Sequence, residues 1–278
     1  MLFQNFHYVL KVMFAQFLTT PKAMPIKVSC VSYLNTKPFI HGLEKTGLLH
    51  DIDLILEMPS QTAKHLQNKD VRVGLVPVAT IPAIPNARII TNFCIGAVGA
   101  VKTVSLYAQQ PLETLTHILL DYQSRTSVQL VQMLCRQFWH LPYIRFTPAQ
   151  PGYEQMITGS TGGVIIGDRT IDWAPKFAFE YDLSQAWHQF TGLPFVFAAW
   201  VTTGNLPAGF ESRLNESFKA GMEAIDEVAE KYQPMYSPNF DVKAYFSKYI
   251  SYQLDEEKLK GLDLFWRYVK ENTLAEAI

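Results

Sequence analysis

Apolar runs of strand length alternate along the chain with stretches in which apolar residues recur at helical spacing. Because strands that alternate with helices build a sheet covered by helices, this pattern is typical of an α/β protein. The apolar runs predict strands at residues 26–32, 52–57, 71–76, 88–95, 103–108, 117–121, 144–147, 163–166 and 195–203.

Helical spacing is clearest at residues 127–138, 214–229 and 259–269. In the first of these stretches, Val128, Val131 and Leu134 fall on one face of a helix. Asp255 precedes the last stretch and is a suitable N-cap, because its carboxylate can accept a hydrogen bond from the first turn. The C-terminal third is therefore predicted to contain helices and no strand-rich run.

A final segment without its own sheet usually packs back onto an earlier one, which predicts two lobes. We expect residues 24–104 and 200–278 to form lobe 1 and residues 105–199 to form lobe 2. Two strands, near 103–107 and 195–201, are expected to cross between them. A cleft for a ligand would then lie between the lobes.

Composition and charge exclude several classes of protein. With 24 Lys plus Arg against 25 Asp plus Glu, the net charge of −1 gives no basic face for nucleic acid or for an anionic membrane surface. The three cysteines form no C-x-x-C pair, which favours neither a disulfide framework nor a zinc site. Free cysteines fit a reducing compartment, so the predicted location is cytoplasmic.

Residues 1–23 are apolar but are interrupted by polar side chains, among them Lys11. A secretory signal has a basic start and then an uninterrupted apolar run, so this segment is a poor match. We interpret it as an N-terminal extension before a natural start at Met24. A weak signal peptide is the open alternative.

The common catalytic templates are missing from the sequence. The seven histidines are scattered, and the glycine-rich stretch at 158–163 is neither a dinucleotide-binding fingerprint nor a P-loop. No cluster of carboxylates has the spacing of a metal site. The chain is therefore predicted to use no metal and no cofactor.

Short polar clusters instead follow the predicted strands. They read SYLNTKP at 32–38, SRTS at 124–127 and GDRT at 167–170. The first N–H groups of a helix have no internal partner and carry partial positive charge, so hydroxyls and amides at a helix start can bind a carboxylate or phosphate. Plain helix capping is the alternative for any one cluster.

Together with TGLPFVFAAW at 191–200, these motifs resemble the chorismate dehydratase family, from about residue 24 to residue 200 and more loosely beyond. The resemblance implies a periplasmic-binding-protein-like fold of type II. It also implies a carbon–oxygen lyase of the futalosine route of menaquinone biosynthesis. That reaction removes water from chorismate, a small dicarboxylate, and gives 3-[(1-carboxyvinyl)oxy]benzoate.

The resemblance implies catalytic roles for Asn35 and for Thr103, which stands where the family usually has serine. The enolpyruvyl carboxylate of chorismate would take the ring proton, while the protein positions the substrate. The implied substrate-binding residues are Ser32, Tyr33, Thr36, Ser124, Arg125, Thr126, Ser127, Gly167 and Asp168.

Two alternatives stay open. The enzyme that makes 1,4-dihydroxy-6-naphthoate in the same pathway shares the fold, but its opening motif resembles SPCPNDT rather than SYLNT. A non-catalytic solute-binding protein would need export, which the interrupted N-terminal segment does not favour. The oligomeric state is not predicted.

Overall fold

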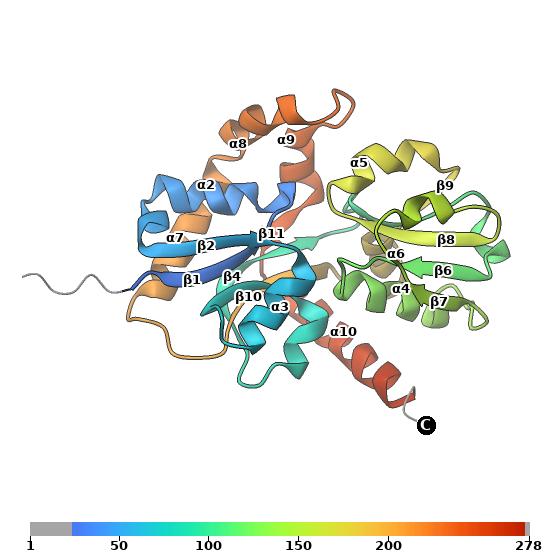
Figure 1. The fold of residues 1–278 in the computed structure, drawn as a ribbon, viewed down its shortest axis with the longest axis horizontal. Helices are drawn as coiled ribbons and strands as arrows, with labels where there is room; N and C mark the ends of the chain where they lie inside the picture. The colour runs from blue at the N-terminus through green and yellow to red at the C-terminus, as the bar shows by residue number, and fades with distance from the viewer. Residues whose placement is uncertain (1–23, 276–278) are drawn as a thin grey trace, which may run out of the picture.

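The computed structural model describes residues 24–275, which form two β-sheets flanked by helices (Figure 1). The earlier interpretation of residues 1–23 lies outside the described residues. The first sheet has the order β11-β4-β10-β3-β1-β2 and the second β7-β6-β8-β5-β9. The strands are β1 (Ile26–Val31), β2 (Ile52–Glu57), β3 (Val73–Pro77), β4 (Arg88–Ala97), β5 (Val104–Ala108), β6 (His117–Leu120), β7 (Arg145–Pro148), β8 (Thr161–Ile166), β9 (Phe179–Asp182), β10 (Phe195–Thr202) and β11 (Ser251–Gln253).

Helices cover both sheets, and each sheet with its helices forms one lobe (Figure 1). The helices are α2 (Lys37–Lys45), α3 (Pro59–Gln67), α4 (Thr126–Gln137), α5 (Arg169–Trp173), α6 (Leu183–Thr191), α7 (Phe210–Glu223), α8 (Ile225–Tyr232), α9 (Val242–Ala244) and α10 (Glu256–Ala275). Helices α4, α5 and α6 belong to the second sheet, and the others pack with the first (Figure 1). Asp255 caps α10 as predicted, because its Oδ1 accepts from the Lys258 N–H at 2.9 Å.

Both sheets mix parallel and antiparallel pairs. Strand β1 is parallel to β2 and β3, whereas β10 is antiparallel to β3 and β4. In the second sheet, β6 is parallel to β7 and β8, and β5 is antiparallel to β8 and β9. The carboxyl ends of β1, β3 and β8 are followed by loops that face the other lobe, which is where ligands bind in open α/β sheets.

The end of the chain returns to the first sheet, as the pattern predicted. Strand β11 pairs with β4, and α10 packs against β10. The final third contains helices and no strand-rich run, as predicted, and the one strand that the described residues form wholly beyond β10 is the three-residue β11. The prediction that two strands cross between lobes was wrong, because β5 lies in the second sheet and β10 in the first.

Short connections therefore cross between the lobes at 98–103, which joins β4 to β5, and at 192–194, which joins α6 to β10. The lobe limits expected from the sequence, at 104/105 and 199/200, stay a prediction. We propose that the crossings themselves lie in these two connections.

The core of the first lobe is aromatic. Phe39 of α2 packs against Trp200 of β10 and Phe218 of α7, with ring centroids 5.7 and 4.6 Å away, and the latter two rings stack on each other at 4.7 Å. Helices α2 and α7 approach so closely that a Cβ added at Gly42 would lie 1.9 Å from the Ser217 carbonyl oxygen. This contact fixes α2, whose N-terminus follows the first polar cluster.

No helix within residues 24–275 is both long enough and apolar enough to cross a membrane. In the same part of the chain, no group of three or more His, Cys, Asp or Glu side chains is arranged to hold a metal ion.

Candidate functional site

A cavity lies between the two lobes and takes its walls from both of them. It encloses about 570 Å³ of space between atoms, a figure that includes the solvent-filled mouth. Its polar walls consist of Tyr33, Asn35, Thr103, Ser124, Arg125, Thr126, Ser127 and the backbone of Gly167. Its apolar walls include Val31, Leu75, Ile95, Val101, Val104, Ile166 and Phe197.

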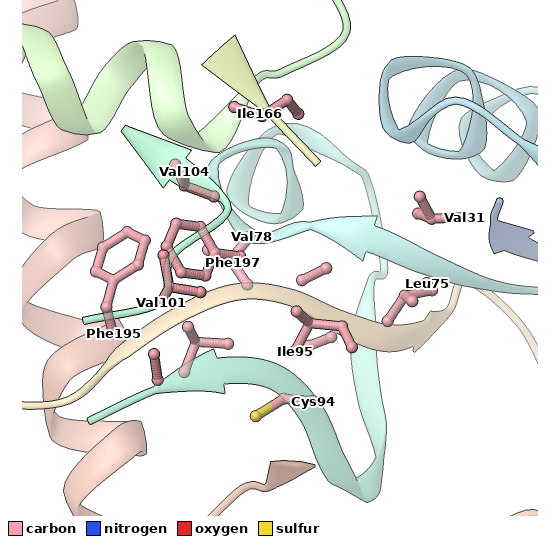
Figure 2. Packing of buried hydrophobic residues seen from close by; sticks show 14 of the residues in the cluster. Val31, Leu75, Val78, Cys94, Ile95, Val101, Val104, Ile166, Phe195 and Phe197 are labelled. Carbon is pink, nitrogen blue, oxygen red and sulfur yellow. The ribbon is translucent and has the colours of Figure 1, made fainter. Parts of the chain in front are cut away.

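Figure 2 shows the packing of buried hydrophobic residues where the two sheets meet, and several of these residues also line the cavity. Leu75, Ile95 and Phe197 come from strands of the first sheet. Val104 and Ile166 come from the second sheet and lie opposite them. Side chains from both sheets therefore form the apolar walls of the cavity.

The first polar cluster makes the turn from β1 into α2. Pro38 occupies the first turn of α2 and Thr36 its N-cap position. The Thr36 hydroxyl turns back to the carbonyl oxygens of Val31, at 2.7 Å, and Tyr33, at 2.8 Å. Thr36 therefore stabilises the turn, and Tyr33 and Asn35 are left on its cavity side.

The second cluster starts α4. Ser124 Oγ accepts a hydrogen bond from the Ser127 N–H at 2.9 Å, so this serine caps the helix. The Thr126 hydroxyl donates to the Phe197 carbonyl oxygen at 3.0 Å and accepts from the Ala79 N–H at 3.3 Å. Thr126 thus ties the start of α4 to the first lobe.

Arg125 stands at the same helix start, exposed to solvent and on the cavity wall. Among the described residues that line the cavity, Arg125 alone carries a formal charge, and none is a carboxylate or a histidine. The partial positive charge of the α4 N-terminus adds to that of the guanidinium. The site is therefore suited to an anion and offers no side chain that is an obvious base.

The third cluster joins the lobes. Gly167 has a φ of +67°, and a Cβ added there would lie 2.9 Å from the Tyr33 ring. The Tyr33 hydroxyl donates across the lobes to Gln123 Oε1. The aromatic ring of one lobe therefore rests on a glycine of the other.

Asp168 forms a second link between the lobes. Its carboxylate accepts from the Leu34 N–H, at 3.0 and 3.1 Å, and from the Tyr236 hydroxyl at 3.0 Å. Burial raises the pKa of Asp168, and these hydrogen bonds together with the Lys37 charge oppose the shift. Its oxygens are thus occupied by protein donors from the first lobe.

A buried ion pair supports the loop that carries the second cluster. Asp121, at the end of β6, accepts from the Arg169 guanidinium, and its other oxygen accepts from the Gln123 N–H at 2.8 Å. Arg169 also donates to Glu154 at 2.7 Å. Burial raises the pKa of Asp121, and the Arg169 charge opposes that shift. This pair orients Gln123, the partner of Tyr33.

Tyrosines from the C-terminal segment complete the site. The Tyr245 hydroxyl lies 2.8 Å from Thr103 Oγ1, and the Tyr252 hydroxyl donates to the Asn35 carbonyl oxygen at 2.9 Å. Burial raises the pKa of Tyr245, while side-chain hydrogen bonds with Thr103 and Asn35 oppose the shift. Two of the residues singled out from the sequence therefore meet at one tyrosine.

The structure brings most of the predicted residues to one cavity. Those on its wall are Tyr33, Asn35, Thr103, Ser124, Arg125, Thr126, Ser127 and Gly167. Ser32, Thr36 and Asp168 lie outside the lining, since Ser32 is exposed and the other two bond to protein partners.

Sequence reasoning missed Gln123 and the tyrosines at 236, 245 and 252. The dense run of tyrosines between 232 and 252 was the available signal.

Known proteins resemble this chain in sequence. A family profile described as menaquinone biosynthesis matches residues 26–271. The chorismate dehydratase of Thermus thermophilus is 26% identical over 228 residues, which cover 74% of this chain and 81% of that protein. This relative confirms the resemblance to the chorismate dehydratase family.

Solved structures confirm the expected two-lobe, periplasmic-binding-protein-like α/β fold. A protein of Archaeoglobus fulgidus superposes with a TM-score of 0.68 at 14% identity, covering 91% of this chain and 99% of that one. The periplasmic aliphatic sulphonate binding protein SsuA of Escherichia coli gives a TM-score of 0.59 at 11% identity, covering 90% and 93%. Since the family profile spans nearly the whole described chain, the protein belongs to the menaquinone biosynthesis family.

Proposed function

We propose that this protein is a chorismate dehydratase, a carbon–oxygen lyase that converts chorismate to 3-[(1-carboxyvinyl)oxy]benzoate. The observation that carries the proposal is the meeting of residues from separate motifs, at 33, 35, 103, 124–127 and 167, on one interlobe cavity. The Thermus relative of that name adds support.

The chemistry fits a wall without a base. The reaction breaks a ring C–H bond and the neighbouring C–OH bond, and the loss of water makes the ring aromatic. With neither carboxylate nor histidine among the described lining residues, the enolpyruvyl carboxylate of the substrate takes the proton. The protein then contributes by holding the substrate in a reactive geometry and by hydrogen bonding to developing charge.

The roles follow from position. Asn35 and Thr103 hydrogen-bond the reacting part of the ring, and Arg125 with the start of α4 holds a carboxylate. Asp168 and Thr36 act indirectly, by fixing the lobes and the turn. No cofactor takes part, and the enzyme works in the futalosine route in the cytoplasm.

The test is incubation of the full chain with chorismate and no added cofactor, with mass detection of a product lighter by one water. Asn35→Ala should lower kcat by roughly 10²–10³-fold, the usual cost of losing one donor to developing charge. Asn92→Ala, at an exposed position of β4, is the matched control and should retain full activity.

Chorismate that binds but stays unchanged would refute the proposal and support a solute-binding protein. Normal turnover by Asn35→Ala would remove that residue from its role. The 1,4-dihydroxy-6-naphthoate synthase alternative lacks support from the opening motif, which reads SYLNT at 32–36.

A further inference from the structure

Tyr245 is a buried side chain outside the motifs that suggested the function. It is 1% exposed and begins the π-helical turn η8 (Tyr245–Tyr249), which leads into β11. Its ring packs between Phe240 and Phe246, with centroids at 5.3 and 5.9 Å. The ring is therefore held by packing that does not depend on its hydroxyl.

The hydroxyl of Tyr245 bonds to side chains. It lies 2.8 Å from Thr103 Oγ1, and the nearby Asn35 side chain opposes the rise that burial causes in the pKa of the same hydroxyl. Both residues line the cavity, although they come from segments of the chain that are far apart in sequence. A tyrosine that only filled the core could satisfy its hydroxyl with any nearby carbonyl oxygen.

Either hydroxyl of the Thr103–Tyr245 pair can be the donor. When Tyr245 donates to Thr103 Oγ1, the proton of Thr103 stays free to reach a ligand in the cavity, whose wall includes Thr103.

We propose that Tyr245 is a positioning residue that aligns Asn35 and Thr103 for the dehydration, so that Thr103 donates a hydrogen bond to the substrate. The proposal rests on the proposed function. Tyr245 itself does not line the cavity and touches no substrate.

Steady-state kinetics of Tyr245→Phe test this role. The substitution removes only the hydroxyl and keeps the ring packing. We expect kcat to fall about tenfold and KM for chorismate to change less than threefold, because binding groups stay in place while the reacting geometry loosens. Tyr107→Phe is the matched control, since Tyr107 is fully buried and bonds to Glu180 at 3.2 Å in the second lobe. It should lower the melting temperature to a similar extent and leave kcat unchanged.

A double-mutant cycle identifies the route of the effect. Thr103→Val removes the hydroxyl that bonds to Tyr245. In that background, adding Tyr245→Phe should therefore lower kcat much less than it does in the wild type. Independent, multiplicative effects of the two substitutions, or a wild-type kcat in Tyr245→Phe, would overturn the proposal.

The side-chain amide signals of Asn35 give a readout that needs no turnover. In ¹H–¹⁵N spectra, Tyr245→Phe should shift these signals and speed their exchange with solvent, whereas Tyr107→Phe should not. Unchanged Asn35 signals refute the positioning role even if chorismate is converted. A wild-type protein that leaves chorismate intact refutes the proposed function alone.

Discussion

The contact between Gly167 and the Tyr33 ring makes a sharp test of how the lobes meet. Gly167→Ala introduces one methyl group into the loop after β8. That methyl group would lie 2.9 Å from two carbon atoms of the Tyr33 ring, well inside van der Waals contact. The clash exists only while the two lobes are in contact.

Two costs add in this variant, and they act on different equilibria. A non-glycine residue at a φ of +67° costs about 1–2 kcal/mol, which lowers the free energy of unfolding. The overpacked methyl group costs a further ~1–3 kcal/mol, and this cost falls on lobe closure. Since the ligand is held between closed lobes, kcat/KM for chorismate should drop about 5- to 150-fold.

Gly47→Ala separates the two costs. Gly47 has a φ of +74° in the turn after α2, but a Cβ there meets nothing within 4 Å. It should lose about 1–2 kcal/mol in urea unfolding, as Gly167→Ala does, while keeping its kcat/KM. Equal kcat/KM values in the two variants would show that the contact between Tyr33 and Gly167 does not control closure.

Asp168→Asn should lower the free energy of unfolding in urea by about 1–3 kcal/mol, because an amide offers one acceptor oxygen where the carboxylate offers two. Asp53→Asn, at an exposed position, is its control. Equal urea unfolding midpoints for the two variants would contradict the role of Asp168. Burial raises the pKa of each of the three cysteine thiols to about 12. A thiol reagent at pH 8 should therefore label no cysteine in the native protein and three in urea. Rapid labelling of the native protein would contradict this burial. Because the folded pKa exceeds the unfolded value near 8.5, the contribution of these thiols to stability is complete below about pH 8.5 and is lost as the pH rises toward 12, as urea midpoints across that range would report. Gly42→Ala should cost about 3 kcal/mol or more, or leave no folded protein by circular dichroism, since its Cβ would overlap the Ser217 carbonyl oxygen; a wild-type melting temperature would show that α2 and α7 can separate freely.

The sequence predicted the buried strands and the edge strands β2 and β7, and it missed the edge strands β9 and β11. Buried strands such as β10 are continuous apolar runs, so their composition alone indicates that they are buried. Strands β9 and β11 lie at sheet edges, and β9 reads FEYD with every residue at least partly exposed. Short edge strands such as these two have one neighbour and need few apolar side chains, so neither periodicity nor composition revealed them.

The polar clusters were predictable because each follows a strand and opens a helix, which is a local pattern. The contacts between lobes were not, since they depend on how the two sheets face each other. Asp168 was predicted to be a substrate-binding residue. Its hydrogen bonds to Leu34 and Tyr236, however, join segments separated by 134 and 68 residues. No local rule carries that information.

The same reasoning predicts a rescue that tests the geometry without relying on either single variant. Tyr33→Leu removes the ring atoms that an added Cβ at Gly167 would meet, and with them the bond to Gln123. In that background Gly167→Ala should cost only the backbone strain, about 1–2 kcal/mol in unfolding, with no further loss of kcat/KM. The double-mutant cycle should therefore return a coupling of about 1–3 kcal/mol between positions that lie on opposite lobes. A coupling near zero would mean that the ring and the glycine do not touch in solution, and that the lobes meet in some other way.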